Sequence, residues 1–147
     1  MPFVQNLLCH KSGGIHTIRP DATVYEATRK MNELRLGALV VTDPARPGRP
    51  LGMFTERDVL MRVVAEKLNP DKVAVGEVMT RSVIVCCPTD EIEDVAATMK
   101  RRRVRHLPVC NGHELVGLIS QGDINAWHVE QAAAQVASLS DYIYGRA

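Results

Sequence analysis

Two pairs of side chains in this sequence combine a hydroxyl with a carboxylate at the same spacing. Thr55 is followed three residues later by Asp58, and Ser120 is followed three residues later by Asp123. At a helix start, the hydroxyl can accept a bond from a first-turn N–H, and the acid is favoured by the helix dipole. The same groups could capture a ligand, because a helix N-terminus attracts phosphate and a carboxylate can accept both hydrogens of a ribose diol. Capping and ligand capture are both open at this point.

The two pairs close two copies of one longer pattern, residues 15–58 and 83–123. Pro20 matches Pro88 at an offset of 68, whereas Gly52 matches Gly117 at an offset of 65. The first copy therefore holds three extra residues, which fall in the proline-rich stretch 42–51. Prolines and a glycine favour turns, and insertions are tolerated in loops, so a surface loop is expected there.

Each copy predicts the same order of elements. A β-rich segment (15–19 or 83–87) leads to a proline, with Asp21 or Thr89 as a helix N-cap. Apolar residues at helical spacing follow, then two apolar runs separated by a turn, and then a second helix near the hydroxyl and acid. One such unit would be marginal alone. We therefore expect an α/β fold of two β-α-β-β-α repeats packed face to face with pseudo-twofold symmetry.

The composition argues against several classes of function. A net charge of +1 gives no bulk attraction to nucleic acid or membrane, and no apolar run is long enough to span a bilayer. The first residues lack the basic and apolar regions of a signal peptide, so a cytoplasmic location is expected. The basic run 100–106 ends a helix and comes with only six aromatic side chains in the chain, which favours phosphate lining over nucleic-acid binding.

Neither a metal centre nor a catalytic site is indicated. The five histidines and four cysteines show no zinc spacing, and buried free thiols are expected for the cysteines. No nucleophile, metalloprotease or phosphate-loop motif is present, so the chain is not expected to be an enzyme.

From about residue 7 to 130, the chain resembles a tandem pair of cystathionine-β-synthase (CBS) domains, a Bateman module, of the small stand-alone bacterial type. The resemblance rests on several motifs in order: Ile18-x-Pro20, Cys86-x-Pro88, Gly37-Ala38-Leu39-Val40-Val41, Arg105-His106-Leu107-Pro108-Val109 and both Thr/Ser-x-x-Asp blocks. The expected organisation is an N-terminal segment (1–12), repeat 1 (13–70), repeat 2 (71–128) and a C-terminal helix (129–147).

The resemblance implies a regulatory protein that binds an adenosine ligand in clefts between the repeats: AMP, ADP, ATP, NAD(H) or S-adenosylmethionine. No other cofactor is required. In the family the acid holds the ribose hydroxyls and the hydroxyl residue contacts ribose or phosphate. Carried onto this chain, the nucleotide-binding candidates are Asp58 and Asp123, Thr55 and Ser120, the adenine-lining Ile18, Cys86, Gly37, Ala38, Arg105 and His106, and also Pro108 and Arg57.

The two copies differ around this shared pattern. Arg105 and His106 stand where the first copy has Gly37 and Ala38, and we expect them to reach across to a phosphate held mainly by the first copy. Arg57 beside Asp58 adds charge, where the second copy has only Gly122. The first cleft is therefore the first choice for a nucleotide phosphate.

The last residues predict a helix with a heptad seam of Val129, Ala132, Val136, Leu139 and Ile143. This seam could pack on the protein's own core or on a twin helix in a homodimer. The leading hypothesis is a nucleotide sensor that regulates an unknown partner protein, and the alternative is a ligand-free dimerisation or scaffold module.

Overall fold

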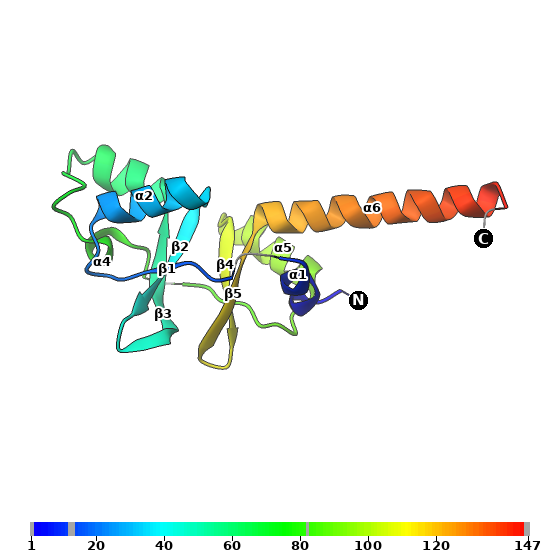
Figure 1. The fold of residues 1–147 in the computed structure, drawn as a ribbon, viewed down its shortest axis with the longest axis horizontal. Coiled ribbons are helices and arrows are strands. Elements are labelled where there is room, and N and C mark those ends of the chain that lie inside the picture. Colours follow the sequence, from blue (N-terminus) through cyan, green and yellow to red (C-terminus); the bar gives the residue numbers. More distant parts are fainter. Residues whose placement is uncertain (1, 12–13, 82, 146–147) are drawn as a thin grey trace.

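Two β-hairpins lie side by side at the centre of the molecule, one from each repeat (Figure 1). The structure, a computed structural model, describes residues 2–11, 14–81 and 83–145. In repeat 1, β2 (Ala38–Asp43) pairs antiparallel with β3 (Arg46–Thr55), and β1 (Thr17–Ile18) pairs parallel with β2. In repeat 2, β4 (His106–Asn111) pairs with β5 (Glu114–Ser120). A single parallel bridge from Cys86 to Val109 stands where repeat 1 has β1.

The first helix of each repeat buries the face that the sequence predicts. Helices α2 (Val24–Leu34) and α5 (Ile92–Arg102) each turn three apolar residues into the core of their own repeat. The predicted N-caps, however, are wrong. Thr23 caps α2 through a capping box with Glu26, and Glu91 occupies the N-cap position of α5. Each helix therefore begins farther along the chain than the preceding proline suggests.

The stretch 42–51 is mostly strand, not the expected loop. Strand β3 begins at Arg46, so only residues 44–45 connect it to β2. Two register shifts, between Val41 and Thr42 and between Thr42 and Asp43, absorb the extra residues. Such irregularities tolerate prolines, which cannot donate to the ladder.

The second helices of the two repeats differ strongly. In repeat 1, α3 (Glu56–Asp58) continues as a π-helix, η1 (Val59–Val64). In repeat 2, α6 (Gln121–Ile143) is one continuous helix that runs without a break past residues 128–129, where the C-terminal helix was expected to begin.

Two short helices each pack on the repeat to which they do not belong in the sequence. Helix α4 (Val75–Val78) packs on repeat 1, where Ala74 bridges Thr23. Helix α1 (Val4–His10) packs on repeat 2, where Phe3 bridges Glu91. The N-terminal residues therefore supply to repeat 2 what α4 supplies to repeat 1.

The core has three parts. Each repeat has its own cluster of buried apolar side chains, and a third cluster joins the repeats. This shared cluster unites Ala38, Val40 and Met53 of repeat 1 with Cys110 and Leu115 of repeat 2. The two repeats thus pack face to face through their hairpins, and the predicted α/β architecture is confirmed.

The distal half of α6 projects beyond the body of the molecule (Figure 1). Its seam residues Val129, Val136, Leu139 and Ile143 are all exposed. Packing of this seam on the protein's own core, one of the two expectations, is therefore wrong. Within the described residues, no helix combines the length and the apolar character needed to cross a membrane.

Candidate functional site

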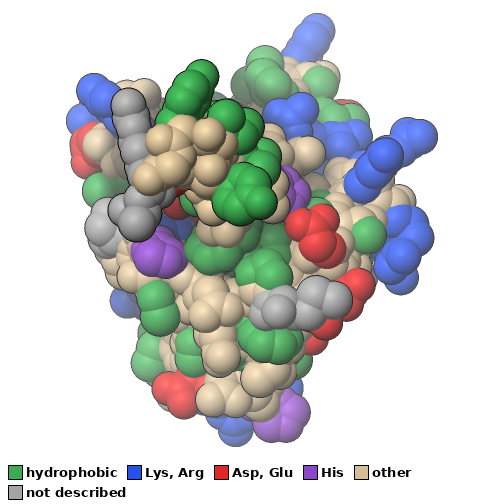
Figure 2. Space-filling view, turned by 90° about the vertical axis from the view of Figure 1, so that its right-hand side faces the viewer, with side chains coloured by type: hydrophobic (Ala, Val, Ile, Leu, Met, Phe, Trp, Pro, Cys, Tyr) green, Lys and Arg blue, Asp and Glu red, His purple; other side chains and the backbone are tan. Residues whose placement is uncertain are grey.

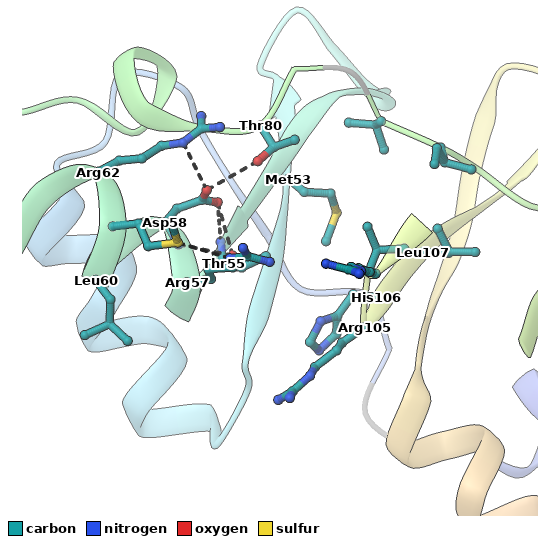
Figure 3. A pocket seen from close by; sticks show the side chains of 15 residues that line it. Met53, Thr55, Arg57, Asp58, Leu60, Arg62, Thr80, Arg105, His106 and Leu107 are labelled. Carbon is teal, nitrogen blue, oxygen red and sulfur yellow. Dashed lines mark hydrogen bonds and ion pairs between the residues drawn. The ribbon is translucent and has the colours of Figure 1, made fainter. Parts of the chain in front are cut away.

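A pocket of about 830 Å³ lies between the two repeats. Repeat 1 contributes the end of β3, α3 and η1, and repeat 2 contributes the residues that lead into β4 (Figure 3). The segment that follows α4 completes the wall. Its polar lining residues are Thr55, Arg57, Asp58, Arg62, Thr80, Arg103, Arg105 and His106, and its apolar ones are Met53, Leu60, Met61, Val83, Ile84, Val104 and Leu107.

The hydroxyl and acid of each repeat form a reciprocal helix cap. Asp58 Oδ2 accepts from the Thr55 backbone N–H at 2.9 Å, and Thr55 Oγ1 accepts from the Asp58 N–H at 3.3 Å. In repeat 2, the corresponding distances between Ser120 and Asp123 are 2.9 and 3.0 Å. The capping interpretation is confirmed for both repeats. It leaves room for a ligand, because a carboxylate has about four lone-pair positions.

The other carboxylate oxygen of Asp58 points to the pocket side of this cap. Asp58 Oδ1 accepts from Thr80 Oγ1 at 3.3 Å and lies 3.6 Å from Arg62 Nε. Arg62 also donates to the carbonyls of Val78 and Met79, which ties η1 to α4. Because Asp58 is buried, these partners offset the cost of keeping a charge away from water.

Positive charge dominates the pocket. Arg57, Arg62, Arg103 and Arg105 line it together with a single acid, Asp58. Figure 3 shows Asp58 with Thr55, Arg62 and Thr80 on one side, and Arg105 with His106 and Leu107 on the other. A ligand with a polar head for Asp58 and an anionic group for the arginines would match this distribution.

His106 lies half-buried between the repeats, beside Gly37. A Cβ on Gly37 would lie 3.4 Å from His106 Cε1, so the absent side chain makes space for the ring. Burial, reinforced by the charge of Lys11, lowers the pKa of His106 below its ordinary value. His106 is thus a neutral hydrogen-bonding group near pH 7, and the arginines carry the positive charge.

The predicted site residues fall into two groups. Thr55, Arg57, Asp58, Arg105 and His106 meet in the pocket. The others do not line it: Ala38, Cys86 and Pro108 are buried, Ile18 packs against the core of repeat 1, Gly37 lies beside His106, and Ser120 and Asp123 cap α6.

The cysteines differ in exposure, contrary to the expectation of four buried thiols. Cys86 and Cys110 are buried, whereas Cys9 and Cys87 are exposed. Burial raises the pKa of Cys86 to about 12, which keeps this thiol protonated and unreactive. Within the part of the chain that the structure describes, no group of three or more His, Cys, Asp or Glu side chains could hold a metal ion.

Sequence reasoning missed two polar residues of the pocket, Arg62 and Thr80, and included a third, Arg103, only as part of the basic run 100–106. Arg62 lies one helical turn after Asp58, and that spacing could have identified it. Arg103 ends α5 in the left-handed conformation with φ of 55°. Thr80 lies between the repeats and had no local signal, because only the folded chain brings it to Asp58.

Comparison with known proteins gives consistent matches. The family model for the CBS domain matches residues 12–65 and 75–130. The chain is 31% identical over 127 residues to the mitochondrial CBS domain-containing protein CBSX3 of Arabidopsis thaliana, covering 85% of this chain but only 62% of the relative.

Two solved structures show the same fold. A CBS-domain protein of Burkholderia ambifaria, described as a candidate signal-transduction protein, superimposes with a TM-score of 0.83 at 33% identity, covering 88% of this chain and 95% of that one. A CBS domain protein of Pyrobaculum aerophilum complexed with AMP has a TM-score of 0.75 at 29% identity, with coverage of 83% and 89%.

Proposed function

The chain belongs to the CBS-domain family. We propose that it is a regulatory protein that binds an adenine nucleotide in the pocket between its repeats. One observation carries the proposal: a single pocket joins Thr55 and Asp58 of repeat 1 to Arg105 and His106 of repeat 2. Its volume lies within the usual range for small-molecule sites. The AMP complex of the Pyrobaculum relative supports an adenosine ligand.

The charges of the pocket favour a ligand with phosphates. Four arginines face one acid, so an anionic AMP, ADP, ATP or NAD(H) fits better than S-adenosylmethionine, whose sulfonium and ammonium are cationic. We assign the ribose hydroxyls to Asp58, with Thr55 beside them, and the phosphates to Arg57 and Arg105. The apolar lining offers a surface for the adenine ring.

Isothermal titration calorimetry with each nucleotide tests the ribose assignment. Asp58→Asn keeps an oxygen for the cap but removes an acceptor of the ribose diol, so binding should weaken at least tenfold. Thr55→Val should lose both the cap and ligand contacts. The matched control Thr23→Val removes the equivalent cap of α2, outside the pocket, and should cost stability of about 1 kcal/mol without changing affinity. Wild-type affinity in Asp58→Asn would refute the ribose assignment.

The phosphate assignment has its own test. Arg105→Gln should weaken ATP binding about tenfold or more, since hydrogen bonds to charged groups contribute about 1.5–3 kcal/mol, and should leave adenosine binding nearly unchanged. Arg101→Gln, in the same basic run but not among the pocket-lining residues, is the matched control. Equal losses of ATP affinity in both variants would show that general charge, not Arg105, attracts the ligand.

We further propose that the chain acts by binding alone, without converting its ligand. A ligand that binds one arrangement of the repeats better than another shifts their population, and a partner protein reads that shift. Incubation of the protein with ATP, followed by chromatography, should return the nucleotide unmodified. Accumulation of ADP or AMP in proportion to protein would overturn this part of the proposal.

The projecting half of α6 supports a homodimer. Its seam spaces Val129, Ala132, Val136, Leu139 and Ile143 at alternating steps of three and four, and all five are exposed. Figure 2, seen from the end at which α6 projects, shows hydrophobic side chains on that face. A twin helix from a second copy would cover this stripe. The same feature favours the alternative function, a dimerisation or scaffold module, if no nucleotide binds.

Sedimentation velocity distinguishes a dimer interface on α6 from one on the body of the repeats. A chain ending at His128, or the full chain with Leu139→Asp, should sediment as a monomer if α6 pairs with its twin. Glu130→Gln, a change on the same helix outside the seam, should remain dimeric. If the shortened chain stays dimeric, the interface lies on the body of the repeats.

A further inference from the structure

The acid of repeat 2 has a different partner from the acid of repeat 1. Lys11 Nζ lies 2.8 Å from Asp123 Oδ2 and 2.6 Å from the carbonyl oxygen of Leu118. In repeat 1, Thr80 takes the corresponding place: its hydroxyl donates to Asp58, and its backbone N–H donates to the carbonyl of Met53 at 2.9 Å. One ammonium group therefore reaches in repeat 2 the same pair of groups, the carboxylate and the strand carbonyl, that Thr80 reaches in repeat 1. On the carboxylate it bonds Oδ2, which also caps α6, whereas Thr80 bonds Oδ1 of Asp58.

Helix α1 delivers Lys11 to this place. Val4 and Leu7 of α1 are buried in the core of repeat 2, and Lys11 is the C-cap residue of the same helix. The side chain of Leu8 fills the space over Gly117, where a Cβ would lie 2.8 Å from Leu8 Cδ2. The lysine stem thus leaves an anchored helix, which limits the conformations that the ammonium must give up to reach Asp123.

The ion pair is shielded from water in part. The Lys11 and Asp123 side chains are 32% and 25% exposed. Burial alone raises the pKa of Asp123, but the hydrogen bonds from Lys11 and from the Ser120 N–H outweigh it and lower that pKa overall. Asp123 therefore stays ionised at neutral pH and retains the ammonium.

We propose that Lys11 stands in for a ribose on Asp123, so that the second cleft is closed and each chain binds one nucleotide, in the first pocket. This inference rests on the proposed function. A ribose diol that bonds both oxygens of Asp123 must displace a charge-assisted bond from Oδ2, whereas at Asp58 Oδ1 it displaces a neutral hydroxyl at 3.3 Å. Arg62 lies at the longer distance of 3.6 Å from Asp58 Oδ1, and two carbonyl partners hold its guanidinium on the α4 side.

Binding stoichiometry on the full chain tests the inference. Equilibrium dialysis with radiolabelled adenosine is suitable, because adenosine needs only the ribose and base contacts and not the arginines of the first pocket. Wild type should bind one adenosine per chain, and Asp123→Asn should leave that binding unchanged. Lys11→Met, which keeps the apolar stem but removes the ammonium, should bind two.

Three controls keep the result interpretable. Lys11→Arg retains a cation and should bind one adenosine. Lys11→Met combined with Asp123→Asn should return to one. Lys72→Met, at an exposed lysine before α4, should also bind one. Circular dichroism verifies that each variant is folded.

The possible failures are distinguishable. Two adenosines bound to wild type, or one bound to Lys11→Met, would overturn the role of Lys11 and leave the proposed function standing. Weaker adenosine binding by Asp123→Asn than by wild type would also overturn the role of Lys11. No binding of adenosine, and none of ATP in the same assay, to any of the proteins would overturn the proposed function itself.

Discussion

Two equivalent glycines provide a sharp test of how the pocket wall is built. A Cβ on Gly52 in β3 would lie 2.6 Å from the carbonyl oxygen of Thr80 and 3.0 Å from Met79 Sδ. A Cβ on the matching Gly117 in β5 would lie 2.8 Å from Leu8 Cδ2, the end of a flexible side chain. In Gly52→Ala the obstacle is backbone, and this backbone is held by two hydrogen bonds of 2.9 Å between Met53 and Thr80.

The expected cost follows from this difference. Gly52→Ala should lower the free energy of unfolding by about 2–3 kcal/mol, at the upper end of the usual range for overpacking, because the Met53–Thr80 backbone bridge must move. Gly117→Ala should cost less than about 1 kcal/mol, since Leu8 can change rotamer. Both variants gain the same reduction in unfolded-state entropy, so their difference isolates the clash. With about 2–4 °C per kcal/mol, Gly52→Ala should melt about 4–12 °C below wild type.

Differential scanning calorimetry measures the two melting temperatures, and titration with ATP gives the second measurement. Because Thr80 moves with its carbonyl, Gly52→Ala should also lose affinity for nucleotide, whereas Gly117→Ala should bind as wild type does. Equal melting temperatures in the two variants would refute the argument from backbone rigidity. A destabilised Gly52→Ala with wild-type affinity would refute the link between this bridge and the pocket.

Three further predictions concern other parts of the chain. Burial lowers the pKa of His106 in the folded state, so the neutral ring contributes stability above its unfolded pKa of about 6.5, and this contribution is lost as the pH falls through the folded pKa. His106→Phe has no such group to protonate. Its melting temperature should therefore fall less than that of wild type between pH 7.5 and 5. Phe54→Ala, at a fully buried core position, should lower the free energy of unfolding by about 3–5 kcal/mol in chemical denaturation. Leu139→Ala, on the exposed, projecting part of α6, should change the stability of the monomer by no more than about 0.5 kcal/mol. Similar values for the two variants would contradict the burial of these two side chains. Iodoacetamide at neutral pH should label the exposed Cys9 and Cys87 before Cys86, as peptide mass spectrometry can measure, and early labelling of Cys86 would contradict its burial.

The architecture was predictable because its signals are local. The offset between Pro20 and Pro88 located the repeats, and helical spacing located the buried faces of α2 and α5. The N-cap error was avoidable, since Thr23 and Glu26 have the spacing of a capping box. The exposure of the α6 seam was not predictable, because a heptad pattern does not say which surface covers it.

The site was predictable only in part, for a physical reason. Thr55, Asp58 and Arg105 were identified through a family pattern, and the fold brings them to one pocket. The contacts that distinguish the two repeats join residues far apart in the sequence. Lys11 and Asp123 are 112 positions apart, and Thr80 and Asp58 are 22 apart. No periodicity encodes such pairs, since they depend on which short helix packs on which repeat.

The crosswise placement of α1 has a consequence for how the chain folds during synthesis. The backbone of Val4 donates to Asp90 and that of Gln5 to Pro88, so α1 leaves the ribosome well before the part of the chain that holds its partners. Repeat 1 needs only the nearby α4 and can close early. Repeat 2 has to recruit α1 across the whole of repeat 1, which raises the entropy cost of closure and slows this step. Docking of α1 is therefore expected to finish folding, and the chain remains open to aggregation at the uncovered core of repeat 2 until then.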